Sequence, residues 1–305
     1  MAQLRPIPIS SKQLNALARS EWLSELAWQS LIAEAELTPK PGLVDGRGPG
    51  SHSDLSLDLM RRSANAIAPY FTRMALASAE AQIDTSLRAV VASIGREAEA
   101  AMLRATSGSN AHKGAIWVLG LLLCAASLSE DSRPELVAEA AGYLARVPDR
   151  ARPQAVSHGD VVRERYGAAG ARGEAYVNFP HVVKIGLPAL KVARTSGRTE
   201  RDSRLTALLA IMSQLDDTCV LYRGGSEANR IVHEGAARVI EVGGPGSPKG
   251  SSALIALGQE LASQRISPGG CADLLAATLF LDALERGLER VEKDNSLVEE
   301  HYGAY

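Results

Sequence analysis

The stretch Asn110-Ala111-His112-Lys113-Gly114 leads directly into a 14-residue apolar run, Ala115 to Leu128. Spanning a bilayer takes about 20 apolar residues, so we expect the run to form a buried core helix instead. Polar groups left unpaired at its entrance would cost roughly 2–7 kcal/mol each. A phosphate chain held by Lys113 and by the free N–H groups of the first turn would pair them. The alternative is a capped helix start whose polar groups are satisfied within the protein.

Composition favours helices in the rest of the chain as well. The 305 residues include 46% hydrophobic but only 4% aromatic residues, and Ala and Leu are abundant. Strands draw on β-branched and aromatic residues, whereas Ala and Leu favour helices. We therefore predict an all-α fold, with a flexible tail at residues 1–10 and one multi-helix globular domain at residues 11–305.

Charge and cysteine content exclude several classes of protein. The net charge of -2 gives no global field that would attract nucleic acid. The three cysteines are far apart and have no metal-binding spacing, which favours a reducing compartment. The N-terminus lacks the basic and apolar regions of a signal peptide. We expect a cytoplasmic protein that does not enter a membrane, and a homo-oligomer is compatible with its sequence.

Apolar spacing and proline positions predict where the main elements lie. We expect helices at 12–37, at 54–68 with a break at Pro69, at 83–102, at 115–128, at 205–222 and at 267–293. Residues 148–188 are expected to be rich in loops. Arg238 to Val242 is the best signal for a strand, and it is short.

Several polar clusters interrupt this helical pattern. In the loop at 38–53, His52 precedes Asp54 and four glycines stand close by, which suggests close approach of the backbone to a ligand. Asp54 and Asp58 would share one helix face near its N-terminus, although a capping role suffices for Asp58. Ser157-His158-Gly159-Asp160 is either a helix cap or part of a site.

The later clusters combine carboxylates with arginines. Gly170-Ala171-Arg172-Gly173-Glu174 suits anion binding beside one acid or base. Asp216 and Asp217 follow a core-facing helical pattern, so they require a cation, either Arg223 two turns later or Mg²⁺. A structural ion pair is the alternative there. Asp273 suits a helix cap and a site equally well.

These segments together resemble the triphosphoribosyl-dephospho-CoA synthase family over roughly residues 25–285. The residues that carry the resemblance are, in order, Thr38-Pro39-Lys40-Pro41-Gly42-Leu43-Val44-Asp45, His52 with Asp54, Asn110 with His112-Lys113-Gly114, Ser157-His158-Gly159, Ala171-Arg172-Gly173-Glu174-Ala175, Asp217-Thr218, Arg223-Gly224-Gly225, and Ser267-Pro268-Gly269-Gly270 with Ala272-Asp273-Leu274-Leu275-Ala276.

The resemblance implies an all-helical bacterial enzyme whose Gly-rich loops gather around a nucleotide site. It implies that ATP loses adenine while its ribose C1′ is joined to the 2′-hydroxyl of 3′-dephospho-CoA. The product would be the prosthetic-group precursor that a separate transferase passes to an acyl carrier protein of malonate decarboxylase or citrate lyase. The stretch Leu57 to Pro69 is closer to the malonate decarboxylase branch.

Candidate roles follow from this chemistry, with Mg²⁺ as the expected cofactor. The candidate catalytic residues are Asp54, His112, Glu174 and Asp217, of which Asp54 and Asp217 are also the candidate metal ligands. The candidate substrate-binding residues are Lys40, His52, Asn110, Lys113, His158, Arg172 and Arg223.

The chain departs from the family pattern at a few positions. Ser56 stands where many relatives have a second Asp, which puts a metal site at 54 and 56 in doubt unless Asp58 substitutes. Ala111 replaces a common Thr, Cys219 a common Asn and Cys271 a common Ser, and none of these changes removes a charge.

Two competing interpretations use the same residues. A Mg²⁺-dependent helical hydrolase of ADP-ribosyl or nucleotide substrates would place water where the acceptor hydroxyl stands. A helical binding or scaffold protein is the non-enzymatic alternative, but it has no need for five Gly-rich loops that each carry charged or imidazole groups.

Overall fold

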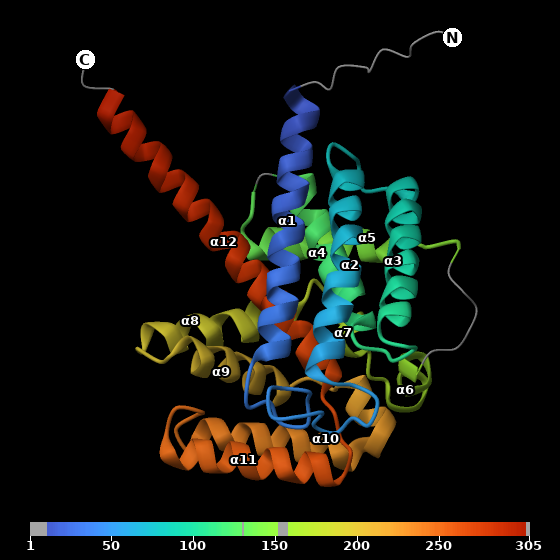
Figure 1. The fold of residues 1–305 in the computed structure, drawn as a ribbon, viewed down its shortest axis with the longest axis vertical. Coiled ribbons are helices and arrows are strands. Elements are labelled where there is room, and N and C mark those ends of the chain that lie inside the picture. Colours follow the sequence, from blue (N-terminus) through green and yellow to red (C-terminus); the bar gives the residue numbers. More distant parts are fainter. Residues whose placement is uncertain (1–10, 130, 152–157, 303–305) are drawn as a thin grey trace.

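The computed structural model describes residues 11–129, 131–151 and 158–302, and within them every named element is a helix (Figure 1). The helices are α1 (Ser11–Glu36), α2 (Leu57–Ser78), α3 (Thr85–Ala105), α4 (Lys113–Leu128), α5 (Pro134–Arg146), α6 (His158–Tyr166), α7 (Gly170–Tyr176), the π-helix η1 (His181–Gly186), α8 (Leu187–Thr195), α9 (Glu200–Met212), α10 (Thr218–Glu241), α11 (Pro248–Ser263) and α12 (Gly269–Tyr302). The all-α prediction is confirmed. The expected tail at residues 1–10 lies outside the described residues.

Helix α4 is the centre of the packing, as its apolar run predicts. Eleven of its residues between Ala115 and Ala126 are buried, and α1, α2, α3, α5, α7 and α12 all contact it. Gly120 lies where Met74 of α2 approaches, since a Cβ added there would stand 2.9 Å from the Met74 sulfur. The side chains that surround α4 therefore come from both ends of the sequence.

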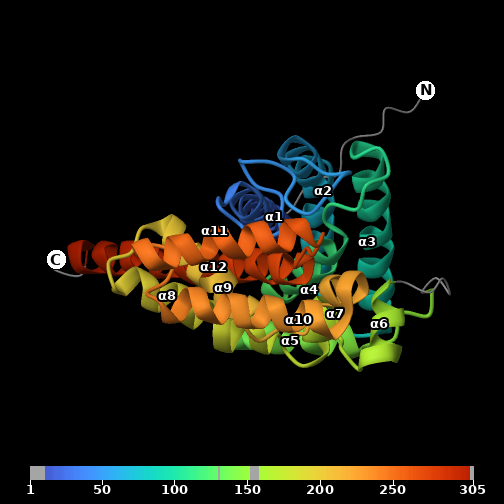
Figure 2. The same cartoon turned by 90° about the horizontal axis from the view of Figure 1, so that it is seen from below.

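The remaining helices form a layer across one end of this group. Helices α1, α2 and α3 stand side by side, while α10 and α11 lie below them and α8 and α9 lie to one side (Figure 1). The view from below shows α10 and α11 crossing that end (Figure 2). The loop between α1 and α2 lies beside α11 at this end of the molecule (Figure 2).

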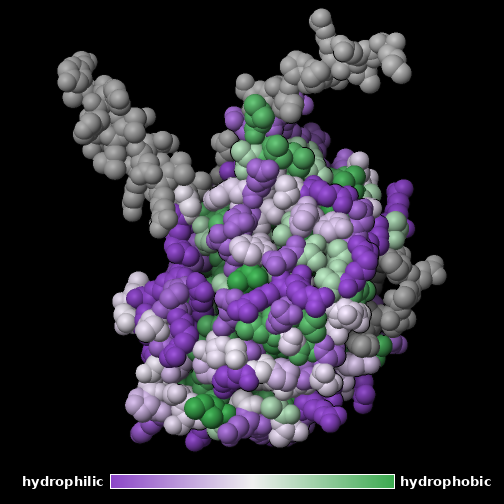
Figure 3. All heavy atoms as spheres, in the orientation of Figure 1, coloured by the Kyte–Doolittle hydropathy of each residue, from purple (hydrophilic) through white to green (hydrophobic). Residues whose placement is uncertain are grey.

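The exterior mixes polar and apolar residues. On the face seen in Figure 3, hydrophilic side chains alternate with small groups of hydrophobic ones. No helix of the described residues combines the length and apolar character needed to cross a membrane. The large apolar side chains instead gather in one main core cluster.

Two expectations about local structure were wrong. Helix α2 continues through Pro69 to Ser78 because Phe71 and Met74 extend its buried face. Burying each of these side chains contributes about 1.5–3 kcal/mol, which together offsets the roughly 3 kcal/mol cost of an internal proline. Residues 238–241 belong to α10 and Val242 is its C-cap, so no strand forms there, because Val232, Ala236 and Val239 form one buried helical face.

The ends of two other helices also differ from their predicted positions. The predicted helix at 205–222 is divided, since α9 ends at Met212 and α10 begins at Thr218. A kink follows inside α10 at Gly225, whose φ of 67° is a conformation that glycine adopts readily. The helix predicted to end at Lys293 continues in α12 to Tyr302. The segment at 148–188 contains α6, α7 and η1 in addition to its loops.

Candidate functional site

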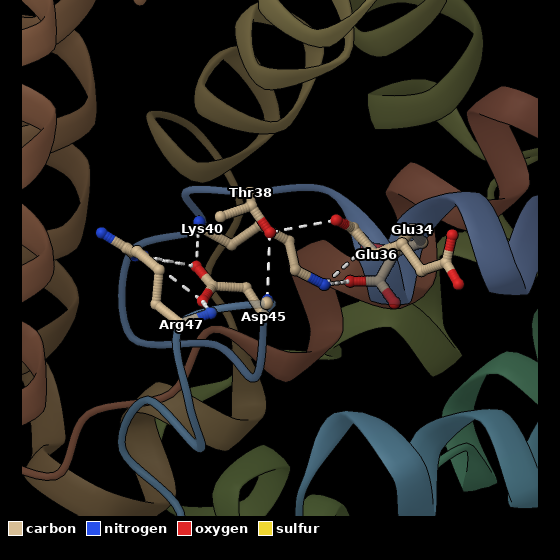
Figure 4. Close-up of polar contacts among 7 residues, drawn as sticks. Glu34, Glu36, Thr38, Lys40, Asp45 and Arg47 are labelled. Atoms are coloured by element: carbon tan, nitrogen blue, oxygen red, sulfur yellow. Dashed lines mark hydrogen bonds and ion pairs between the residues drawn. The ribbon is translucent and has the colours of Figure 1, made fainter.

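The loop after α1 is organised by the buried carboxylate of Asp45 (Figure 4). This carboxylate accepts hydrogen bonds from the backbone N–H groups of Lys40 at 2.8 Å and Arg47 at 2.7 Å, and from the Arg47 guanidinium. The Thr38 hydroxyl joins the two sides of the loop, because it accepts from Gly46 N and donates to the Glu36 carbonyl. The loop is therefore held by its own polar groups.

Lys40 points into the protein and not toward solvent. Its residue is 2% exposed, and its ammonium group donates to the Glu34 carboxylate at 2.5 Å and to the Glu34 carbonyl at 2.6 Å. Removing one partner of such a buried ion pair strongly destabilises the fold, because the other charge is left buried and unpaired. The contacts of Lys40 thus hold the end of α1 against the loop.

The same loop is fastened to the segment that precedes α12. Gly42 has a φ of 71°, and a Cβ added to it would stand 2.5 Å from the Ile266 carbonyl oxygen, so the position requires glycine. The Ser51 hydroxyl donates to that carbonyl at 2.6 Å. Next to it, His52 Nε2 lies 2.8 Å from the hydroxyl of Ser267. His52 is thereby fixed beside the start of α12.

Asp217 joins the first turns of two helices that are far apart in the sequence. Its Oδ1 accepts from Cys219 N at the start of α10, and its Oδ2 accepts from Cys271 N at the start of α12, each at 2.8 Å. The residue is 0% exposed, and burial raises the pKa of its carboxyl group. Asp217 is the N-cap of α10, so Asp216 and Asp217 do not lie on one helix two turns before Arg223, as the sequence predicted. Arg223 instead reaches toward the Arg265 carbonyl.

Asp273 of α12 is a second carboxylate that lies against the first turn of a helix, here α4. A Cβ added to Gly114 would stand 1.9 Å from the Asp273 carboxylate, so only glycine leaves room for that group. Burial, followed by the nearby carboxylates of Glu34 and Asp217, raises the pKa of Asp273 well above its ordinary value. The sequence left the role of Asp273 open, and the structure shows it against the first turn of α4.

His112 is a buried imidazole with one nitrogen in use. Its Nδ1 lies 2.7 Å from the Ser63 hydroxyl, whereas Nε2 has no hydrogen-bond partner among the described residues. Burial, followed by the neighbouring Lys40 ammonium, lowers the pKa of His112 to about 3. The imidazole is therefore neutral at physiological pH and can still form one hydrogen bond through Nε2.

Three predicted residues near the start of α4 are accessible. Asn110 caps the helix by accepting from Lys113 N at 3.1 Å, and the Lys113 ammonium pairs with Glu99 of α3 at 3.0 Å. Asp54 lies beside them, since its carbonyl accepts from the Ser109 hydroxyl and its carboxylate is 3.7 Å from His52 Nδ1. The side chains of Lys113 and Asp54 are 55% and 57% exposed, so a ligand can reach them.

Glu174 of α7 is bound to a histidine that the sequence analysis missed. The Glu174 carboxylate accepts from His181 N and lies 2.8 Å from His181 Nδ1. That hydrogen bond raises the pKa of His181. The two residues are seven positions apart across a helix break, a spacing that no periodic pattern indicates. His181 therefore holds the carboxylate that was a candidate for direct catalysis.

Asp216 lies near a second group of polar side chains. Asn229 of α10 donates to the Asp216 carboxylate at 2.7 Å and accepts from Asp217 N at 3.3 Å. His233, one turn after Asn229, lies 4.0 Å from Asp216. Neither Asn229 nor His233 was predicted, because their partners come from the break before α10.

The other predicted residues occupy a neighbouring part of the structure. Arg172 of α7 lies 3.8 Å from the Asp160 carboxylate of α6. His158 begins α6, but its side chain lies outside the described residues, as does Ser157. Asp58 is in the first turn of α2, where Ser56 provides the cap, so Asp54 and Asp58 do not share a helix face.

The proposed metal ligands differ in their accessibility. Asp54 presents an exposed carboxylate, whereas both oxygens of Asp217 already accept backbone N–H groups. Within the described part of the chain, no group of three or more His, Cys, Asp or Glu side chains surrounds one point. Mg²⁺ in nucleotide sites needs only one or two carboxylates beside phosphate oxygens and water. The pairing of Asp54 with Asp217 around a metal stays a prediction.

Comparison with known proteins gives one consistent result. The family model described as ATP:dephospho-CoA triphosphoribosyl transferase matches residues 20–292. A relative from Pseudomonas fluorescens, named as a probable 2-(5''-triphosphoribosyl)-3'-dephosphocoenzyme-A synthase, is 49% identical over 90% of this chain and 95% of its own length. Relatives with the same name from Pseudomonas paraeruginosa and Azotobacter vinelandii are each 51% identical, over 88% and 87% of this chain and 92% of their own lengths. No solved structure matches the chain.

The contact between Gly114 and Asp273 generates a first prediction. Gly114→Ala places a methyl group where the Asp273 carboxylate lies, so we expect the free energy of unfolding to fall by about 1–3 kcal/mol. Urea denaturation measures the change. Gly258→Ala in α11 is the matched control, because its nearest neighbour would be 3.7 Å away and the change should stabilise by about 0.5–1 kcal/mol. Equal stability of the two variants would contradict the predicted clash.

The two histidines with opposite pKa shifts generate a second prediction. The pKa of His181 is raised by its bond to Glu174, so its charge stabilises the fold below pH 6.5, and that contribution is lost as pH rises through the folded-state pKa. The pKa of His52 is lowered, mainly by burial, so its contribution is present above pH 6.5 and is lost as pH falls. We expect the stability cost of His181→Gln to shrink with rising pH and that of His52→Gln to grow, in denaturation series from about pH 5 to 9. Parallel trends would contradict these shifts.

Proposed function

The chain belongs to the ATP:dephospho-CoA triphosphoribosyl transferase family, and we propose that it transfers the triphosphoribosyl part of ATP to the 2′-hydroxyl of 3′-dephospho-CoA. The observation that carries the proposal is the match of the family model over residues 20–292, which include every residue of the candidate site. The products are adenine and 2′-(5″-triphosphoribosyl)-3′-dephospho-CoA.

The protein must donate a proton to adenine, accept a proton from the attacking hydroxyl and hold the triphosphate. Breaking the bond between adenine and ribose develops positive charge at C1′, and the departing adenine takes up a proton. The attacking 2′-hydroxyl gives up a proton as its oxygen bonds to C1′, so the overall proton balance is zero. Glycoside cleavage has the same needs and divides them between an acidic and a basic carboxyl group. The triphosphate must also be held while C1′ reacts.

The different environments of Asp273 and Asp54 suit the acidic and basic roles. Asp273 has a raised pKa and lies against the first turn of α4, so it can keep the proton that adenine requires. Asp54 is exposed beside His52 and can accept the proton of the hydroxyl. The unpaired Nε2 of neutral His112 can hydrogen-bond to a substrate. This division adds Asp273 to the residues that the sequence indicated.

Glu174 and Asp217 are better explained as positioning residues. Each carboxylate already accepts two hydrogen bonds inside the protein. Glu174 holds His181, and Asp217 holds the starts of α10 and α12. Lys40 joins them in this role through its buried pair with Glu34.

Basic and polar side chains from several elements suit phosphate binding. The residues proposed to contact phosphates or the rest of the two substrates are Asn110, Lys113, His52, His158, Arg172 and Arg223. Mg²⁺ would lie beside Asp54, whose exposed carboxylate offers the oxygen ligand that this ion prefers. When bound, the ion supplies positive charge to the triphosphate.

We further propose that the product serves malonate decarboxylase. A separate transferase would attach it to the acyl carrier protein of that enzyme in the cytoplasm. The support is the resemblance of residues 57–69 to that branch of the family, with citrate lyase as the other candidate recipient.

Mass spectrometry of the purified protein with ATP, Mg²⁺ and 3′-dephospho-CoA tests the reaction. We expect adenine and a triphosphoribosyl adduct of dephospho-CoA in equal amounts. Adenine with free triphosphoribose, formed without the acceptor, would favour the hydrolase instead. The absence of both products would overturn the proposed reaction.

Lys113 provides a test of the site itself. Its ion pair with Glu99 is exposed and contributes about 0–1 kcal/mol to stability. Lys113→Ala should therefore leave the fold intact but lower turnover by about 100-fold, because one phosphate contact in the transition state is lost. Lys191→Ala is the matched control, since Lys191 pairs with Glu285 at similar exposure on α8. Equal turnover of the two variants would remove Lys113 from the site.

A further inference from the structure

Arg88 of α3 is a buried charge that forms no ion pair with any described residue. The residue is 6% exposed, and its Nε–H has no hydrogen-bond acceptor among the described residues. No described carboxylate forms an ion pair with its guanidinium, and the nearby Asp149 is already paired with Arg96 at 2.8 Å. Burial lowers the pKa of Arg88, and Arg172 contributes to that shift. Leaving such a group unpaired is costly, so an absent anion is the simplest explanation for it.

Two more donors beside Arg88 lack acceptors. The guanidinium carbons of Arg88 and Arg172 lie 5.2 Å and 5.5 Å from the centre of the Trp117 ring. The indole Nε1–H and the Arg172 Nε–H are buried and have no hydrogen-bond partner in the described part of the chain. Among the described residues, the guanidinium of Arg172 forms one ion pair, a distant one at 3.8 Å from Asp160. Arginines of α3 and α7 thus both lie over the Trp117 ring of α4, and each of the three side chains has an N–H donor without an acceptor among the described residues.

We propose that Arg88, Arg172 and Trp117 form a binding site for the phosphate chain of a nucleotide substrate. Guanidinium groups present donors in a fork that matches phosphate oxygens, and an indole N–H can add one more. The aromatic ring keeps the two guanidinium groups in place through cation–π contacts while no anion is present. Arg88 and Trp117 thereby join Arg172, which the sequence already indicated.

Trp117 places this site on the same helix as Lys113, which lies at the accessible N-terminal end of α4. Trp117 follows Lys113 by four residues, so the two side chains share one face of α4. ATP and dephospho-CoA each carry a phosphate chain, and Lys113 with the Arg88 site offers separate positions for the two chains. The assignment to these nucleotides rests on the proposed function, whereas the binding of a polyphosphate anion does not.

Calorimetric titration of the full-length protein with inorganic pyrophosphate and tripolyphosphate tests the anion site. We expect both Arg88→Met and Arg172→Met to weaken binding at least tenfold. Arg73→Met is the matched control, because Arg73 also lies over an aromatic ring, that of Tyr70, but is exposed and paired with Glu97 at 2.7 Å. Unchanged affinity in Arg88→Met and Arg172→Met would overturn the proposal.

Thermal unfolding separates binding from packing at Arg88. Because Met fills a similar volume without an unpaired charge, Arg88→Met should unfold at the same temperature as the parent or higher. If Arg88→Met unfolds at a lower temperature while Arg172→Met binds pyrophosphate normally, Arg88 serves packing and the proposal fails. Arg172 is partly exposed, so its variant tests the site even where Arg88→Met does not fold.

Titrations with ATP and with dephospho-CoA identify which phosphate chain the site holds. A tenfold loss for ATP alone assigns the triphosphate, and a loss for dephospho-CoA alone assigns the diphosphate. Normal affinity for both nucleotides in the two variants would overturn the assignment to a substrate. Pyrophosphate binding that depends on Arg88 in a protein that forms no adduct would refute the proposed reaction and leave the anion site standing. Normal adduct formation together with unchanged pyrophosphate affinity in Arg88→Met would refute the anion site and leave the proposed reaction standing.

Discussion

The structure depends on carboxylates placed at helix N-termini. Asp217 accepts backbone N–H groups from the first turns of α10 and α12, and Asp273 approaches the first turn of α4. The free N–H groups and the dipole at these ends favour negative charge. The carboxylates therefore fix the relative positions of three helices whose starting points are up to 156 residues apart, from Lys113 to Gly269. The two loops that flank the site, before α2 and before α12, can then be fastened to each other by Gly42, Ser51 and His52.

This arrangement also separates charge by depth. Glu34 and Asp217 are buried, with Asp273 partly buried beside them, and in the same interior Lys40 is paired with Glu34 and His112 is neutral. Burial, followed by repulsion from the carboxylates of Glu34 and Asp217, raises the pKa of Asp273. The accessible Lys113 and Arg223 lie around this interior. In the proposed function, a nucleotide would place its phosphates against the accessible cations and against the Arg88 site, and its reacting bond against a carboxyl group that retains its proton.

The fold could be predicted because the strongest signals were local. The run from Ala115 to Leu128 is apolar on every face, and only a helix enclosed by other helices can bury it. Glu174 and Asp217 were recognised as important residues, but their partners could not be identified from local patterns. His181 and Cys271 contact them across helix breaks, and the contact with Cys271 spans 54 positions. Pro69 misled the prediction because the packing of Phe71 and Met74 outweighs the local preference of proline.

Arg88 is a charged residue inside an apolar helical pattern, and this position is visible in the sequence itself. It lies next to Leu87 and one turn before Val91, within the buried face of α3. A charged residue there interrupts the apolar helical periodicity. Such a residue must either reach the surface, find a carboxylate or await a ligand. The first is excluded by its burial and the second by the pairing of Asp149 with Arg96. Charged residues that interrupt a buried stripe therefore indicate a binding site more sharply than exposed clusters do, because solvent cannot compensate for them.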